Sequence, residues 1–478
     1  MHRRGSGDRH HRRTGVSRAE QLAGVLSEGA VSVDDRDLAA HARDLSASAL
    51  IRERSGQTPA APEVVVRPAD TDEVARLLAW ADRERAPIVP FGGGSSVVRG
   101  ISPGGAVVVD LSRMASVLEL DEKSRLVRVQ AGIRGDALQA SLAENGWMLG
   151  HQPQSMALST VGGWIATRAA GQLSLGFGAI EDVVTAFDVV LPGGRVLRGR
   201  VHPRRSTGPG LEHLLMGSEG ALGIVTEAVI RIVPALQQRA DASFTFKSMS
   251  AGVAACRAVA QSGTSPMLAR LYDAEDTAIF WRRLDQPPAG PLLVTSARDA
   301  GTLDRVAALV AAAGGEPAAE SLTSYWWEHR NDAAEDFLHA MAGGGILGAN
   351  PAIETIEVSA TWSNLRDLYH SLKEGLKGEA DVVGCHLSHA YPEGACLYFT
   401  LASACGDDAA AGSRLDAWWE KAMATTLAAG GSISHHHGIG RTRARWIREE
   451  LGDWYELLVA LKRVIDPNGI MNPGVLGL

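Results

Sequence analysis

The segment "GGSISHHHGIGR", residues 430–441, places His435, His436 and His437 side by side near the end of the chain. Imidazole can ligate a metal ion or carry a proton near neutral pH. A leftover tag is a poor explanation, because only three histidines are present and they lie inside an apolar, glycine-rich segment. On a strand, neighbouring side chains alternate faces, so His435 and His437 could share one ion but all three could not. The run alone leaves metal binding and proton transfer open.

Three glycine-rich turns lie earlier in the chain: "PFGGGSS" at 90–96, "PQSMALSTVGGW" at 153–164 and "GSEGALGIVTE" at 217–227. Glycine lets backbone N–H groups converge on phosphate oxygens, because no Cβ is in the way. Further hydroxyl donors are offered by Ser95, Ser96 and Ser159. None of the turns is a P-loop, and none is a G-x-G-x-x-G turn that opens a long helix. Each alone indicates only a tight turn, but three beside strand patterns favour an extended diphosphate ligand.

Strand and helix patterns must position these turns. A β-branched run at 64–66 predicts a strand, and Asp70 with Glu73 resembles a capping box for the helix that follows. A short buried strand at 87–90 leads directly into the first glycine turn. A Pro-Gly-Gly turn at 192–194 separates two strand patterns and predicts a hairpin. Short strands with few helices therefore indicate an α+β domain.

The chain of 478 residues is long enough for two or three domains. We expect a disordered basic tail at 1–15 and a helical segment at 16–58. The first domain covers 59–235. Strands alternate with helices over 236–405, which predicts a second domain built as a sheet covered by helices. Residues 406–478 read as helix, histidine loop and helix.

Composition excludes several classes of protein. The formal net charge is -8, with 45% hydrophobic and 21% charged residues, so a general nucleic-acid grip is not expected. The four cysteines form no C-x-x-C pair and suit a reducing, cytoplasmic compartment. No apolar run reaches about 18 residues, so no transmembrane span is predicted. The basic start lacks an apolar region behind it and does not read as a secretory signal.

The motifs "PFGGGSSV", "STVGGWIATRAAG" with "GAIEDVV", and "LLMGSEGALGIVTEAVIRIVP" resemble the PCMH-type FAD-binding domain of the vanillyl-alcohol oxidase superfamily. Their order and spacing match over about 59–235. The resemblance implies a two-subdomain FAD-binding domain with FAD extended across it, and a cap domain over the flavin. Some relatives attach flavin through a histidine beside the first glycine turn. This chain offers only Phe91, Ser95 and Ser96 there, so we expect non-covalent FAD.

The resemblance also implies which residues line the cofactor. They are Pro90, Phe91, Gly92, Gly93, Gly94, Ser95 and Ser96 at the pyrophosphate, and Pro153, Gln154, Ser155, Met156, Ala157, Leu158, Ser159, Thr167, Arg168, Ala169, Ala170, Glu219, Gly220, Ala221, Leu222, Gly223, Ile224 and Val225 along the rest.

Two branches of the superfamily are similar to the carboxyl half. In FAD-linked D-2-hydroxy-acid dehydrogenases, a His-x-Gly-Asp-Gly-Asn-Leu-His segment and a Glu-His-Gly segment hold a divalent metal in some members. Here His389 matches the first histidine, Leu397 or Tyr398 stands near the second, and His436 replaces the glutamate. We therefore expect no bound metal, and a metal held by His386, His389 and His436 is the minority alternative.

The alkyldihydroxyacetonephosphate synthases are the other branch. The chain is similar to them almost residue for residue in "SMALSTVGGW", "YPEGACLYFT" and "GGSISHHHGIGRTRARW". That family exchanges the acyl chain of an acyl-dihydroxyacetone phosphate for a fatty alcohol, through an adduct at flavin N5 and without net redox change. The resemblance implies that Tyr398 is the acid/base residue, that His435, His436 and His437 line the same pocket, and that Arg270 is needed for activity.

The chemistry accounts for these residue types. A proton next to a ketone must be removed by a base within hydrogen-bond reach. Tyrosine has an ordinary pKa of about 10, so we expect the neighbouring histidines to lower the pKa of Tyr398. A phosphate monoester requires a fixed cation, Arg270, with Arg441 or Arg443 as alternates.

The chain also departs from the synthases. The tryptophan-rich segment associated with them is absent before residue 59, and for a second substrate arginine Arg330 is the nearest match. Trp326 and Trp327 would line a tunnel for a lipid chain or simply pack in the cap. The alternatives to a synthase are an FAD-linked D-2-hydroxy-acid oxidase or dehydrogenase, and a flavin-binding protein without turnover. As partners we expect a small-molecule or lipid-like substrate, and we leave peripheral membrane contact and a homodimer open.

Overall fold

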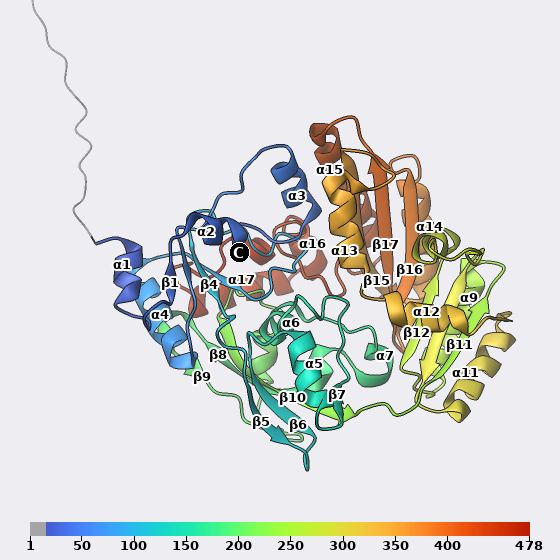
Figure 1. Cartoon of the computed structure of the whole chain (residues 1–478), viewed down its shortest axis with the longest axis horizontal. Coiled ribbons are helices and arrows are strands. Elements are labelled where there is room, and N and C mark those ends of the chain that lie inside the picture. The colour runs from blue at the N-terminus through green and yellow to red at the C-terminus, as the bar shows by residue number, and fades with distance from the viewer. Residues whose placement is uncertain (1–15) are drawn as a thin grey trace, which may run out of the picture.

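The computed structural model describes residues 16–478; the tail expected at 1–15 lies outside the described residues. Three β-sheets organise the chain (Figure 1). A four-stranded and a six-stranded sheet belong to the first half, and a seven-stranded sheet belongs to the second half. Helices pack on all three sheets, which is the α+β architecture expected from the sequence.

The amino-terminal segment contains three short helices. Its helices are α1 (Arg18–Ala23), α2 (Asp35–Ala40) and α3 (Ala47–Arg54). The prediction of a helical segment did not include β1 (Val31–Ser32), which pairs antiparallel with β2 (Val64–Val66). Two residues are too few to show a strand pattern, and their hydrogen-bond partners lie on a strand later in the chain.

The four-stranded sheet has the order β1-β2-β4-β3, with β3 (Ile88–Phe91) and β4 (Val107–Asp110). β2, β4 and β3 run parallel. A parallel sheet is buried on both faces, which explains the continuous β-branched runs. Since β3 ends at Phe91, the sheet delivers the first glycine loop from its carboxyl edge.

Helix α4 (Thr71–Glu84) follows β2 and forms half of the expected capping box. Asp70 accepts a hydrogen bond from the backbone N–H of Glu73. The Glu73 carboxylate accepts from the N–H groups of Ala69 and Ser27 instead of from Asp70. The sequence pattern predicted the start of the helix correctly. The carboxylate of Glu73, however, binds the distant N–H of Ser27 instead of closing the box.

The six-stranded sheet carries the other two glycine loops. Its strands are β5 (Val117–Asp121), β6 (Leu126–Gln130), β7 (Trp147–Leu149), β8 (Val184–Val190), β9 (Val196–Leu197) and β10 (Ile224–Pro234). β10 pairs with β6, β7 and β8, and β8 and β9 form the expected antiparallel hairpin around Pro192–Gly194. The helices here are α5 (Gly135–Ala143), α6 (Val161–Thr167), α7 (Ser174–Phe177) and α8 (Ile180–Val183).

The seven-stranded sheet has the order β14-β11-β13-β12-β16-β17-β15, and all its pairs are antiparallel. The strands are β11 (Ala240–Thr245), β12 (Leu268–Tyr272), β13 (Leu292–Ala297), β14 (Glu316–Ala318), β15 (Pro351–Thr361), β16 (Val382–Ala390) and β17 (Gly394–Ala404). The sequence patterns did not single out β16. Nearly all of its residues are buried, so the polar–apolar alternation that reveals a half-buried strand is lost.

Helices cover this sheet, which lies at the right of Figure 1. They are α9 (Met249–Gln261), α10 (Ala274–Phe280), α11 (Ala300–Ala312), α12 (Ser321–His329), α13 (Ala333–His339), α14 (Trp362–Leu376) and α15 (Asp408–Ala428).

The chain then returns from the seven-stranded sheet to the first half of the molecule. After α15, Ser432 bridges to Ser359 on β15, and the histidine loop follows. Beyond α16 (Ile447–Leu451) and α17 (Trp454–Ile465), Met471 bridges to Ile88 on β3. The histidine loop therefore lies between the strand that delivers the first glycine loop and the seven-stranded sheet.

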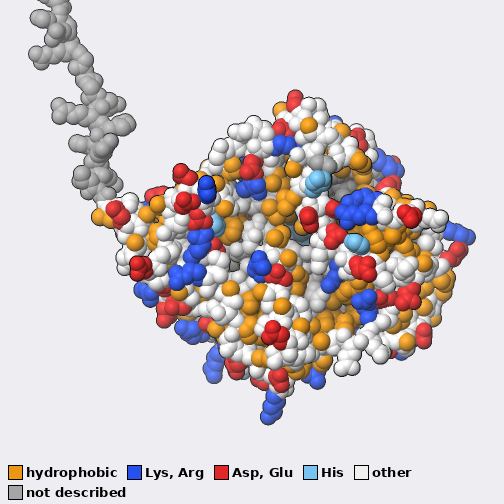
Figure 2. Space-filling model, viewed as in Figure 1, with side chains coloured by type: hydrophobic (Ala, Val, Ile, Leu, Met, Phe, Trp, Pro, Cys, Tyr) orange, Lys and Arg blue, Asp and Glu red, His pale blue; other side chains and the backbone are white. Residues whose placement is uncertain are grey.

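Among residues 16–478, no helix is both long and apolar enough to span a membrane. The four cysteines are unpaired. On the face drawn in Figure 2, Lys and Arg side chains are scattered among Asp and Glu.

Candidate active site

The three glycine loops meet at one place. A Cβ added to Gly93 would lie 1.7 Å from the carbonyl oxygen of Leu158, so the first loop touches the second. A Cβ on Gly220 would lie 2.8 Å from Pro90, which brings in the third loop. Only glycine permits approaches this close. The loops therefore form one continuous backbone surface.

The first loop presents unused backbone donors. Within residues 16–478, the N–H groups of residues 93–96 donate no hydrogen bond. Consecutive free N–H groups form a concavity that binds anions, and this fits a diphosphate. The hydroxyl oxygen of Ser96 accepts from the N–H groups of Val98 and Gly100, both at 3.3 Å, so Ser96 shapes the turn. The backbone N–H groups of the loop remain as donors for a ligand.

The third loop is tied to the histidine loop by Glu219, which has a left-handed backbone (φ 49). Its carboxylate accepts from the N–H groups of Ile439, at 2.7 Å, and Gly440, at 2.8 Å. Burial raises the pKa of Glu219 to about 7, against the effect of these two hydrogen bonds. The contact shows how the carboxyl-terminal segment closes over the glycine loops.

Several side chains expected at the cofactor are occupied elsewhere. Arg168 forms a partly exposed ion pair with Glu181 at 3.0 Å. Ala221 and Leu222 are buried in the core, and the carbonyl of Ala221 accepts from Lys462. In these segments the backbone groups, rather than the side chains, are available to a ligand. The assignment of the segments to FAD stays a prediction.

The histidine loop does not follow strand alternation. The ring nitrogens Nδ1 of His435 and His436 lie 2.9 Å apart, so adjacent rings meet. The strand alternation by which His435 and His437 could share one ion does not apply, because this segment is an irregular loop. Burial lowers the pKa of all three histidines, that of His437 to about 4. All three are therefore neutral imidazoles near pH 7.

Tyr398 lies on β17, next to the histidine loop. Its ring stacks on His386 with centroids 4.8 Å apart, and the His437 ring meets it edge-on at 5.4 Å. Burial raises the pKa of Tyr398 to about 12, although a hydrogen bond with Thr355 works in the other direction. The expectation that the histidines lower this pKa is wrong, because neutral imidazoles bring no positive charge. Tyr398 is a protonated phenol in this environment.

Arg270, on β12, belongs to a buried chain of three side chains. One of its N–H groups donates to Nε2 of His386 at 2.6 Å, and Nδ1 of His386 lies 2.6 Å from Asp276. The carboxylate of Asp276 holds the proton on Nδ1, which leaves Nε2 free to accept. Arg270 is 6% exposed, so its charge lies in the protein interior.

A second arginine lies near Arg270. The guanidinium of Arg330 is 5.8 Å from the Trp326 ring centroid, and that of Arg270 is 5.6 Å from the same ring. Arg330 also lies 4.4 Å from the ring centroid of Trp327 and donates to Gln152 at 3.2 Å. The tryptophans thus pack against guanidinium groups, which supports the cap-packing interpretation over a lipid tunnel.

Neither Arg270 nor Arg330 forms an ion pair within the described part of the chain, and each keeps a buried N–H group without a partner. Burial lowers the pKa of Arg330 to about 10, and the charges of Arg239 and Arg270 add to this effect. Of the alternates for anion binding, Arg441 donates to two backbone carbonyls, and the charge of Arg443 is paired with Glu357 although its Nε and Nη2 have no partner. The structure therefore offers Arg270 and Arg330 to an anion.

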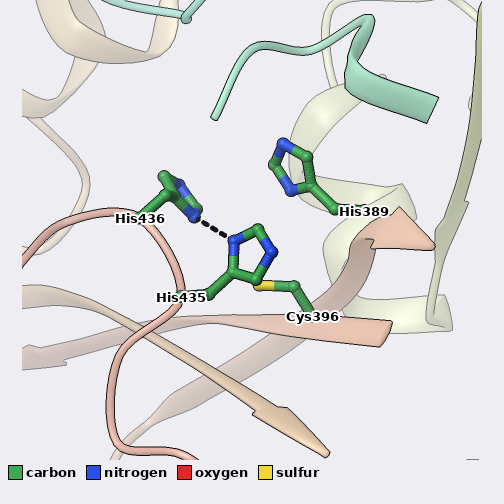
Figure 3. A group of neighbouring side chains, drawn as sticks. All are labelled: His389, Cys396, His435 and His436. Atoms are coloured by element: carbon green, nitrogen blue, oxygen red, sulfur yellow. Dashed lines mark hydrogen bonds between the residues drawn. The ribbon is translucent and has the colours of Figure 1, made fainter. Parts of the chain in front are cut away.

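Four side chains form what we call the His–Cys cluster: His389, Cys396, His435 and His436 (Figure 3). Their ligand atoms all lie within 4.8 Å of one another, and three nitrogens with one sulfur are a set that Zn²⁺ accepts. Two nitrogens on tetrahedral Zn²⁺ would be about 3.3 Å apart. The 2.9 Å between His435 and His436 is instead the distance of an N–H···N hydrogen bond. His386 is not part of the cluster, because Asp276 and Arg270 hold it.

Two family models match the chain. One is an FAD binding domain over residues 62–200, and the other is the C-terminal domain of FAD linked oxidases over residues 236–476. The chain belongs to the FAD-linked oxidase family. FAD is its cofactor, in agreement with the sequence prediction.

Similar proteins carry different names. The chain is 31% identical over 470 residues to alkyldihydroxyacetonephosphate synthase of Dictyostelium discoideum, covering 89% of this chain and 74% of that protein. It is also 31% identical over 438 residues to an uncharacterized FAD-linked oxidoreductase, YgcU, of Escherichia coli K12, covering 87% and 89%. D-lactate dehydrogenase of Anaerostipes hadrus is 26% identical over 445 residues, covering 87% and 88%.

Solved structures confirm the fold. A structure of alkyldihydroxyacetonephosphate synthase superposes with a TM-score of 0.77 at 27% identity, covering 95% of this chain and 83% of that one. p-Cresol methylhydroxylase, at 16% identity and a TM-score of 0.75, covers 96% of both chains and shows the fold alone. The predicted PCMH-type FAD-binding domain with a helix-covered sheet as cap is confirmed.

Sequence reasoning missed two acidic residues of this FAD-linked oxidase site. Asp276 lies in the first turn of α10 and was indistinguishable from a residue that favours a helix start. Glu357 stands inside an apolar strand, "TIEVSAT". A carboxylate in such a run is a usable signal, because a buried charge requires a partner.

Proposed function

We propose that this FAD-linked oxidase exchanges the acyl chain of an acyl-dihydroxyacetone phosphate for a fatty alcohol, as in ether lipid synthesis. The observation that carries the proposal is the pair of the buried Arg270 and the partly buried Arg330, which both lie against Trp326. Arg270 is linked to Tyr398 through His386. The 31% identity to a protein named alkyldihydroxyacetonephosphate synthase supports the proposal.

The arginine pair suits a phosphate monoester. Two guanidinium groups that share the Trp326 ring and lack carboxylate partners repel one another and are costly to bury. An anion that binds both removes that cost, and guanidinium groups bind phosphate in a bidentate manner. A phosphate monoester supplies two negative charges for two arginines, whereas a monocarboxylate supplies one. The electrostatics therefore favour a phosphorylated head group.

Tyr398 and the histidine loop suit proton transfer. The phenol of Tyr398 is protonated and can donate, and the neutral rings of His436 and His437 can accept. A donor and acceptors held together can remove a proton beside a ketone and return one to a leaving group. When bound, FAD supplies an electrophilic, redox-active ring. We propose that it is held non-covalently, since no histidine stands in the first glycine loop.

Anaerobic mixing tests the proposal. The purified protein should be yellow, and it should convert palmitoyl-dihydroxyacetone phosphate and labelled hexadecanol to the alkyl product with release of palmitate and without an electron acceptor. A strict requirement for an electron acceptor would reject the exchange reaction.

The second candidate is an FAD-linked D-2-hydroxy-acid oxidase or dehydrogenase. The D-lactate dehydrogenase relative favours it, and Arg270 alone would suffice for one carboxylate. Bleaching of the flavin by D-lactate or D-glycerate under anaerobic conditions would support this candidate over the exchange reaction.

A further inference from the structure

Glu357 is fully buried on β15, directly opposite Tyr398 in the antiparallel pairing with β17. Its carboxylate collects donors from both arms of the histidine loop. One oxygen, Oε1, accepts from the hydroxyl of Ser434 at 3.1 Å and from the N–H of His437 at 3.0 Å. The other oxygen, Oε2, accepts from the N–H of His435. One side chain thus holds the loop on either side of His436.

Arg443 binds both this carboxylate and the backbone of the histidine loop. Arg443 is 0% exposed and donates to Oε1 of Glu357 at 2.7 Å and to the carbonyl of Gly438 at 2.9 Å. Burial opposes the charge of Glu357, but the charge and the hydrogen bond of Arg443 outweigh burial and keep the pKa of Glu357 well below its ordinary value. The carboxylate is therefore ionised at neutral pH and can accept on both oxygens.

We infer that Glu357 is a positioning residue, whose carboxylate fixes the histidine loop against Tyr398 and so sets the path of proton transfer. The catalytic use of this proton path rests on the proposed function, but the anchoring of the histidine loop by Glu357 does not. A glutamine has one acceptor oxygen and a donor in place of the other, so it cannot serve the N–H groups of both His435 and His437. A misplacement of about 1 Å can reduce turnover on the order of 100-fold.

The first test is Glu357→Gln. We expect FAD content to stay at the wild-type level and kcat to fall about 100-fold. The KM for the phosphorylated substrate should stay close to that of the wild type, because Arg270 and Arg330 are unchanged. A wild-type kcat in this variant, or a loss confined to KM, would overturn the positioning role.

Glu354→Gln is the matched control. Glu354 is also buried on β15, but its carboxylate accepts from Trp419 at 3.0 Å and makes no contact with the histidine loop. Burial raises the pKa of Glu354 to about 7, so the neutral amide resembles the state already populated near neutral pH. We expect wild-type turnover. If the two variants lose activity equally, the effect is a general one of removing a buried carboxylate and the inference fails.

A double variant separates anchoring from charge pairing. Glu357→Gln leaves Arg443 buried without its counter-ion, which can unfold the protein on its own. Adding Arg443→Met removes both charges, so the melting temperature should recover while kcat stays low. Recovery of kcat together with stability would show that the pair is structural only.

A readout that needs no substrate distinguishes failure of this inference from failure of the proposed function. Diethyl pyrocarbonate modifies accessible neutral histidines, and mass spectrometry of the peptide that carries residues 430–441 reports on the loop alone. We expect faster modification in the double variant than in the wild type. An unchanged rate would overturn the anchoring even if the enzyme performs the exchange. A faster rate in an enzyme without exchange activity would leave the anchoring intact and reject only the proposed function.

Discussion

Replacement of Arg330 by methionine should stabilise the protein and weaken its hold on phosphate. Burial and the charges of Arg239 and Arg270 lower the pKa of Arg330 from its ordinary value to about 10, which corresponds to roughly 3 kcal/mol of unfavourable free energy. Because this pKa lies below that of the unfolded chain, the cost is fully present at pH 7 and fades only as pH rises through about 10.

Two terms set the expected sizes. The lost cation–π contact with Trp327 offsets about 0.5–2 kcal/mol of the gain, so Arg330→Met should raise the free energy of unfolding by about 1–2.5 kcal/mol. A hydrogen bond to a charged group contributes about 1.5–3 kcal/mol, so affinity for phosphate should fall about 10- to 150-fold.

Thermal unfolding of the FAD-loaded protein, with and without inorganic phosphate, measures both effects. Without phosphate, the wild type should melt at a lower temperature than the variant. Added phosphate should raise the melting temperature of the wild type more than that of the variant. Arg239→Met is the control: Arg239 lies 4.4 Å from the Trp327 ring centroid but is paired with Asp241 at 2.8 Å. This variant should keep the response to phosphate. A less stable Arg330→Met that still responds fully to phosphate would refute the reasoning.

Four further outcomes are expected. Tyr398→Phe should abolish turnover while the flavin absorbance stays unchanged; full activity would reject its acid/base role. Turnover should fall as pH drops through about 4, where His437 becomes charged, and a fall centred near 6.5 would show that burial does not lower its pKa in this way. Gly93→Ala should prevent FAD loading, measured as the ratio of absorbance at the flavin and protein bands, because its Cβ would meet the carbonyl of Leu158 at 1.7 Å. Metal analysis of the purified enzyme should find no stoichiometric metal. Added Zn²⁺ should inhibit turnover, because its binding would break the hydrogen bond between His435 and His436 in the His–Cys cluster. Retained zinc that supports turnover would contradict both expectations.

The sequence was informative where a local requirement is written into residue type. Gly93 and Gly220 are glycines because the loops approach too closely for any side chain, and that requirement is visible as a motif before the structure is known. These turns and the buried strands beside them predicted an extended diphosphate ligand, and their resemblance to a known family implied the FAD-binding fold and FAD itself. The helix start at Asp70 also followed from residue type.

The structure decided what depends on neighbours distant in sequence. The pKa of Tyr398 is raised rather than lowered, because burial dominates and the nearby imidazoles are neutral. His386 orients Arg270 instead of joining a metal group, because Asp276 claims its other nitrogen. The sequence by itself determined which chemical groups the site contains and the fold that carries them. Only the tertiary structure decided their protonation and their partners, because desolvation and hydrogen bonding depend on contacts between strands and loops that no local pattern records.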